Sequence, residues 1–202
     1  MQPRLVVEQK ITVFTNQYRI FAANTEGGKA QMVSFVQQKR LAFKEKVSFY
    51  TDESKQQLAF TFRAEKVLDV HGRYFVEDAN GQPVGAFQKQ FGKSLINSTW
   101  NILDANGNQK ILVNESNQFI AIFRRIAGLI PYVGNLLELV AVLFRYHFKF
   151  VDVSSGEEIG RYQKTTLIRD HYLLSMTDAG YQSNDWRVLA AVAVALDALQ
   201  SR

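Results

Sequence analysis

Three histidines carry the side chains best suited to metal binding or proton transfer, but their spacing supports neither role. His71, His147 and His171 lie far apart in the chain, and no two stand four residues apart, the spacing with which two helical histidines ligate one metal ion. Asp69 and His71 lie two apart on one expected strand face, where they could act as an acid–base dyad. A hydrogen bond between them on the surface explains the pair more simply. We therefore predict no catalytic residue, no metal site and no cofactor.

The motifs of nucleotide binding and nucleophilic catalysis are missing as well. Glu26-Gly-Gly-Lys29 does not have the GxxxxGK[ST] spacing of a phosphate-binding loop. The sequence contains no GxSxG nucleophile motif and no cysteine, so a thiolate can act neither as a nucleophile nor as a metal ligand. These observations favour a protein that is not an enzyme.

Basic residues are concentrated in the first quarter of the chain. Residues 1–50 contain eight Lys and Arg residues and three acidic ones, whereas residues 51–202 contain sixteen of each, so the first quarter carries the whole net charge of +5. The densest group is Lys39, Arg40, Lys44 and Lys46. Such a group favours an anionic partner, a phospholipid headgroup or nucleic acid, although an ordinary solvated strand face has the same composition.

The elements that must position these residues follow a repeated β-hairpin pattern. Residues 74–89 and 148–164 each contain an aromatic-led strand, an aspartate, a glycine turn and a second strand that ends in Gln-Lys. The sequence Asp-Ala-Asn-Gly occurs twice and places Asn-Gly where a hairpin needs positive φ. The two copies and two expected variants of this turn are Asp78–Gly81, Asp104–Gly107, Ser155-Gly156 and Asp178–Gly180. The leading aspartates accept backbone N–H bonds in such turns, so we expect no calcium there.

Ten to twelve short segments rich in aromatic and β-branched residues lie between the turns, which is typical of strands. So many strands in one domain form a sandwich or close into a barrel, which removes exposed edges. A closed barrel of about twelve strands is wide enough to hold a helix.

The C-terminal segment predicts such a helix, apolar on every face. Asn184 and Asp185 supply N-cap oxygens, and Trp186–Leu199 contains only Arg187 and Asp197 as polar residues. Its apolar part spans roughly 18 Å, short of the ~30 Å hydrocarbon core of a bilayer, so protein should surround it. We predict a single domain over residues 1–202 with a β-rich α+β fold, a closed antiparallel β-barrel of about twelve strands that encloses a hydrophobic C-terminal α-helix at about 185–200.

Residues 117–144 resist this scheme because they are largely apolar. Residues 117–127 have helical spacing, and the apolar run that follows is broken by Pro131, Gly134 and Asn135, with Glu138 near the middle of any span. We expect a connecting helix, a turn and a buried strand from Leu136 towards Phe150, and no transmembrane span.

Residues 38–53 and 60–107, which include QKRLAFKEKVSFYTDE and FVEDANGQPVGAFQKQFGKSLINSTWNILDANG, resemble the LURP-one-related family. That family belongs to the tubby C-terminal-like superfamily, together with the phospholipid scramblases. The resemblance implies a twelve-stranded β-barrel around a hydrophobic C-terminal helix. Tubby proteins bind phosphoinositides through basic residues on the barrel surface, and scramblases act at membranes with calcium. With three prolines and no cysteine, this chain lacks the proline-rich region and acylated cysteine cluster of scramblases, so we do not expect calcium-dependent scrambling.

The resemblance and the charge together predict a non-enzymatic module that binds a membrane surface or a phospholipid of the phosphoinositide type. The predicted headgroup-binding residues are Lys39, Arg40, Lys44, Lys46, Arg124 and Arg125. The N-terminus shows no signal peptide, so we expect a cytoplasmic protein, peripheral at the membrane. The alternatives are a protein-interaction scaffold without a lipid role and a transcription-linked nucleic-acid-binding barrel, which a net charge of only +5 disfavours. The third alternative is a barrel that binds a small apolar ligand in an interior pocket, which is disfavoured because the C-terminal helix would fill the interior.

Overall fold

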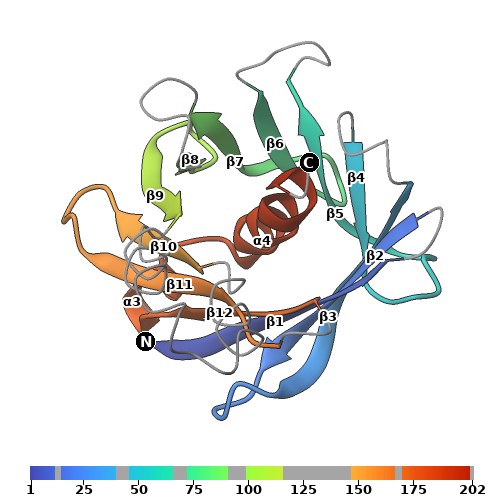
Figure 1. Cartoon of the computed structure of the whole chain (residues 1–202). Helices are drawn as coiled ribbons and strands as arrows, with labels where there is room; N and C mark the ends of the chain where they lie inside the picture. The colour runs from blue at the N-terminus through green and yellow to red at the C-terminus, as the bar shows by residue number, and fades with distance from the viewer. Residues whose placement is uncertain are drawn as a thin grey trace, which may run out of the picture.

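A closed β-barrel surrounds one long helix in the computed structural model of the chain (Figure 1). The structure describes residues 1–11, 15–39, 46–65, 72–90, 99–115, 147–166 and 170–200. Each strand pairs with its neighbours in sequence in antiparallel fashion, and β1 closes the barrel by pairing with β12. The predicted fold class is therefore confirmed.

The strands alternate with short turns or with longer connections. They are β1 (Gln2–Ile11), β2 (Thr15–Ala23), β3 (Lys29–Lys39), β4 (Lys46–Tyr50), β5 (Leu58–Ala64), β6 (Arg73–Asp78), β7 (Pro83–Gln90), β8 (Thr99–Leu103), β9 (Gln109–Glu115), β10 (His147–Asp152), β11 (Glu158–Lys164) and β12 (Asp170–Met176). Two helices follow, α3 (Asp178–Gln182) and α4 (Trp186–Gln200).

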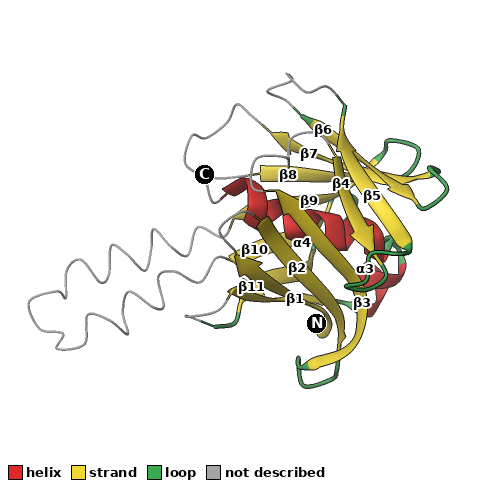
Figure 2. Cartoon of the chain, turned by 90° about the vertical axis from the view of Figure 1, so that its right-hand side faces the viewer, coloured by secondary structure: helices red, strands yellow, loops and turns green. Residues whose placement is uncertain are grey.

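The barrel has two distinct ends, because the strands run alternately up and down (Figure 2). The turn end contains the tight turns that join β2 to β3, β4 to β5, β6 to β7, β8 to β9 and β10 to β11. It also contains α3 and the start of α4. The turn end comprises residues 24–28, 51–57, 78–82, 104–108, 152–157 and 177–187. At the exit end, where α4 finishes, the odd-numbered strands end and the even-numbered strands begin.

The Asp-Ala-Asn-Gly turns form as predicted at the glycine and differently at the asparagine. Gly81 and Gly107 have φ values of +81° and +84°. The preceding residues Asn80 and Asn106 do not have positive φ, since Lys55 is the one non-glycine with positive φ among the described residues. Asp78 donates its N–H to the carbonyl of Gln82 (2.9 Å) and accepts from the N–H of Gly81 (3.0 Å). The loop is thus a three-residue hairpin with a left-handed glycine at its end, and it needs positive φ at one residue only.

The expected hairpin turn at Asp178–Gly180 was wrong. The chain forms the short helix α3 there, because Thr177 acts as its N-cap and accepts the N–H of Gly180 at 3.1 Å. α3 turns the chain from the end of β12 back towards the barrel axis, so that α4 can enter from the turn end (Figure 1).

α4 begins where the sequence predicts. The Asp185 carboxylate accepts the backbone N–H of Arg187 at 2.8 Å. The backbone carbonyl of Asp185 accepts the N–H groups of Val188 and Leu189. The side chains from Val188 to Leu196 are all buried, on every face of the helix. The predicted enclosed helix is therefore confirmed.

Large strand side chains and small helix side chains make up the core. Trp100, Tyr18 and Phe87 are among the largest fully buried side chains, while α4 contributes mainly Ala and Val. α4 comes close to the barrel wall at Gly85 of β7, where an added Cβ would lie 2.8 Å from both a Val188 methyl group and the Leu103 carbonyl oxygen. This glycine lets the first turns of α4 touch the barrel wall.

The expectations for residues 117–144 lie outside the described residues, apart from the end of the predicted strand, which corresponds to the start of β10 at His147. Among the described residues, no helix has the length and hydropathy needed to cross a bilayer.

Leu189→Ala should destabilise the barrel strongly. Leu189 is fully buried at the barrel centre, and truncating such a side chain leaves a cavity, so the free energy of unfolding should fall by about 2–5 kcal/mol. Urea denaturation measures this change, with Val153→Ala as control because Val153 is 46% exposed. Equal stability of the two variants would contradict the packing of α4 in the core.

Candidate functional site at the exit end

Two of the predicted headgroup-binding residues flank one strand connection at the exit end. Lys39 is the last residue of β3 and Lys46 the first of β4, and Lys46 is exposed. Arg40, Lys44, Arg124 and Arg125 lie outside the described residues, and so do Asp69 and His71. The structure thus places the described part of the predicted site at the end where α4 finishes.

The strand termini at the exit end are predominantly basic. The last two residues of each odd-numbered strand and the first two of each even-numbered strand include seven basic and two acidic residues, a net charge of +5. The basic residues are Lys10, Lys39, Lys46, Arg63, Arg73, Lys89 and Lys164, and the acidic ones are Glu115 and Asp170. We call the seven basic residues the basic rim.

Contacts within the barrel orient several members of the basic rim. Lys46 lies directly opposite Arg63 in the β4–β5 pairing, and Arg63 forms an ion pair with Glu77 at 2.8 Å. The Lys89 ammonium lies 5.6 Å from the ring centre of Trp100, and that of Lys164 lies 5.9 Å from that of Tyr172.

The turn end carries the opposite charge. Its residues include nine acidic side chains and two basic ones, Lys55 and Arg187, a net charge of −7. The acidic residues are Glu26, Asp52, Glu53, Asp78, Asp104, Asp152, Glu157, Asp178 and Asp185. The charges of the barrel are therefore separated between its two ends.

Hydrogen bonds favour the ionised form of four of these carboxylates, those of Asp52, Asp104, Asp152 and Asp185. Bonds from Ser54, Asn108 and Ser154 lower the pKa values of Asp52, Asp104 and Asp152 respectively. Burial of the Asp185 carboxyl opposes ionisation, but hydrogen bonds from the Arg187 side chain and backbone outweigh it and lower the pKa.

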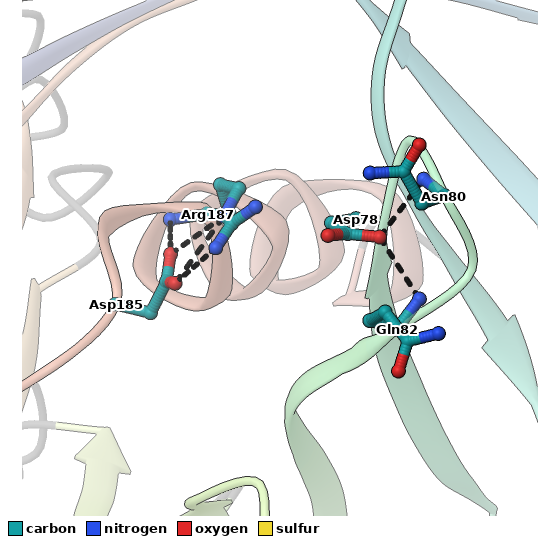
Figure 3. A network of polar contacts seen from close by, with 5 residues as sticks. All are labelled: Asp78, Asn80, Gln82, Asp185 and Arg187. Atoms are coloured by element: carbon teal, nitrogen blue, oxygen red, sulfur yellow. Dashed lines mark hydrogen bonds and ion pairs between the residues drawn. The ribbon is translucent and has the colours of Figure 1, made fainter.

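Figure 3 shows two of these arrangements at the turn end, the Asp185–Arg187 pair and the Asp78 turn. The Asp78 carboxylate accepts the backbone N–H groups of Asn80 and Gln82, both at 2.9 Å. The turn aspartates therefore satisfy local backbone donors, as the sequence predicted.

Among the described residues, no three His, Asp or Glu side chains gather in a way that could hold a metal ion.

A part-buried carboxylate ties the last turns of α4 to the barrel wall at the exit end. Asp197 accepts hydrogen bonds from the hydroxyl groups of Tyr18 on β2 (2.9 Å) and Tyr172 on β12 (2.5 Å). Gln9 on β1 in turn donates to the Tyr18 oxygen at 2.9 Å. We call Gln9, Tyr18, Tyr172 and Asp197 the carboxylate clamp.

The clamp joins three consecutive strands of the barrel, β12, β1 and β2, to the helix. Burial and then the neighbouring Asp197 carboxylate raise the pKa of Tyr18 far above its ordinary value, so the hydroxyl stays protonated and remains a donor. Sequence reasoning identified Asp197 only as a polar residue near the helix end.

His171, the third histidine of the sequence, belongs to a polar group that also contains Glu8 and Lys29. His171 Nε2 lies 2.9 Å from a Glu8 carboxylate oxygen, which also bonds the Lys29 ammonium at 2.6 Å. Only the backbone of His147 is described. This group links β12, β1 and β3.

The family follows from a comparison of the whole sequence with known families. A family model described as LURP-one-related matches residues 32–197. The chain belongs to the LURP-one-related family. The barrel and its central helix are consistent with the tubby C-terminal-like superfamily that the sequence resemblance implied. No curated protein and no solved structure matches the chain. β1 and β2 precede the matched residues, yet they close the barrel of this family member.

Tyr18→Phe and Tyr172→Phe should each destabilise the fold without changing its shape. Each removes one hydroxyl group that donates to the part-buried Asp197 carboxylate, and the loss of this charge-assisted hydrogen bond lowers the free energy of unfolding by about 1–3 kcal/mol. Chemical denaturation measures the effect. Tyr50→Phe is the control, since Tyr50 lies half-buried outside the clamp and its loss should change stability by less than about 0.5 kcal/mol. Clamp variants as stable as this control would contradict the clamp.

Proposed function

We propose that this LURP-one-related protein is a non-enzymatic module that binds anionic phospholipid at the cytoplasmic surface of a membrane, with headgroups of the phosphoinositide type as its ligands. The observation that carries the proposal is the basic rim, which gathers seven of the chain's basic residues at one end of the barrel. Family membership supports it, because the fold is one in which tubby proteins bind phosphoinositides.

The filled interior of the barrel supports binding at the surface. α4 occupies the axis, and its side chains from Val188 to Leu196 are buried against the strands. A lipocalin-like ligand would have to displace this helix and the core that depends on it. A lipid ligand is therefore expected at the outside of the barrel, where basic side chains reach solvent.

The size of the charge is adequate for reversible membrane binding. Each Lys or Arg close to an anionic surface contributes about 1 kcal/mol, and the contribution falls off within a Debye length of about 8 Å at physiological salt. The net +5 of the exit-end strand termini would thus contribute on the order of 5 kcal/mol. Lys39 and Lys46 belong to this rim, and Arg40 and Lys44 lie between them in the sequence. Arg124 and Arg125 belong to the segment between β9 and β10 in the sequence.

Sedimentation with vesicles tests the proposal. We expect the protein to bind vesicles that contain phosphatidylserine or a phosphoinositide, to bind less at high salt, and not to bind phosphatidylcholine alone. Replacing Lys39, Arg40, Lys44 and Lys46 by Gln should weaken binding by at least about tenfold, since each lost cation removes about 1 kcal/mol.

The matched control replaces four basic residues away from the exit end, Lys55, Lys110, Lys149 and Arg161, by Gln, and should retain binding. Equal weakening by both variants would contradict the proposed site. Failure to bind any anionic vesicle would contradict the membrane role and favour a protein-interaction scaffold, and tighter binding to nucleic acid than to lipid would favour the nucleic-acid alternative.

A further inference from the structure

The separation of charge along the barrel restricts how the molecule can meet a membrane. The exit-end strand termini carry +5, or +4 when the adjacent Glu65 is included, and the turn end carries −7, or −6 when Arg4, which pairs with Asp178, is included. β1, with ten residues, runs from one end to the other. At about 3.3 Å per residue and the usual barrel tilt, the ends lie on the order of 20–25 Å apart. This distance is about three Debye lengths at physiological salt, so a membrane acts mainly on the end that faces it.

We propose, on the basis of the function proposed above, that the barrel docks end-on, with the exit end against anionic lipid and the acidic turn end directed away from the membrane. In this pose the basic rim lies at the headgroups and the acidic turns stay in water beyond the reach of the surface potential. The opposite pose places a net −7 against an anionic surface, which repels it.

Side-on docking is disfavoured by the same charges. It brings both ends to the same distance from the lipid, so that the attraction of the basic rim is opposed by the repulsion of the turns. Three of the turn carboxylates are held in their charged form by hydrogen bonds, which keeps this repulsion in place. Their bonds to Ser54, Asn108 and Ser154 favour the ionised form of Asp52, Asp104 and Asp152.

The carboxylate clamp lies at the end that faces the membrane in this pose. It ties three of the strands at the exit end to the last turns of α4.

Single-cysteine labelling tests the pose directly, because the natural sequence contains no cysteine. Thr165→Cys and Glu65→Cys place probes at the exit end next to β11 and β5, which lie on opposite sides of the barrel. Asn80→Cys places a probe in the turn between β6 and β7. All three positions are exposed. Each variant carries an environment-sensitive fluorophore, and vesicles of phosphatidylcholine and phosphatidylserine contain brominated lipid as quencher.

End-on docking predicts quenching at both Thr165 and Glu65, and fluorescence at Asn80 that stays at its vesicle-free level. Quenching at one exit probe only, at Asn80, or at none of the three while the protein sediments with the vesicles would overturn the end-on pose and leave membrane binding standing. A labelled and an unlabelled protein that both fail to sediment would instead overturn the proposed function and the pose together.

Discussion

The packing of α4 inside the barrel is the constraint on which the rest of the structure depends. A barrel of twelve strands has an interior too wide for strand side chains alone to fill. The chain meets this requirement with large aromatic residues on the strands and a helix of small ones, including Ala190, Ala191 and Ala193, all fully buried. Small helix residues let the strands approach the axis, and Gly85 permits a close contact with Val188. Without the helix the inner face of the barrel would be exposed to water, and without the barrel the apolar surface of α4 would be exposed in the same way.

Each end of α4 is fastened by a carboxylate, and the two attachments differ in kind. Asp185 caps the first turn locally and pairs with Arg187, whereas Asp197 bonds tyrosines from β2 and β12 across the barrel. Because the interior is occupied, recognition is left to the outer surface and the ends. The proposed membrane binding therefore rests on the charge separation between the ends.

Local patterns in the sequence predicted what depends on neighbouring residues. The cap at Asp185, the enclosed helix and the positive φ of Gly81 and Gly107 all follow from short motifs. Asp178 was misread because a neighbouring Thr177 cap makes the same Asp-Ala-Gly segment helical. The clamp could not be predicted, since Tyr18 and Asp197 lie 179 residues apart. The charge separation could not be predicted from the sequence for a similar reason. The acidic turns recur at intervals along the chain and meet only when the strands alternate in direction.

Amide hydrogen exchange, resolved along the chain, tests most directly whether α4 is the core of the fold. If the barrel depends on the helix, the amides of residues 188–196 open only when the whole protein unfolds. Their opening free energy should then equal the global free energy of unfolding and match that of the best-protected barrel strands. Exchange in α4 that is much faster than in the strands, with the barrel still folded, would show that the barrel stands without its helix and would contradict the account.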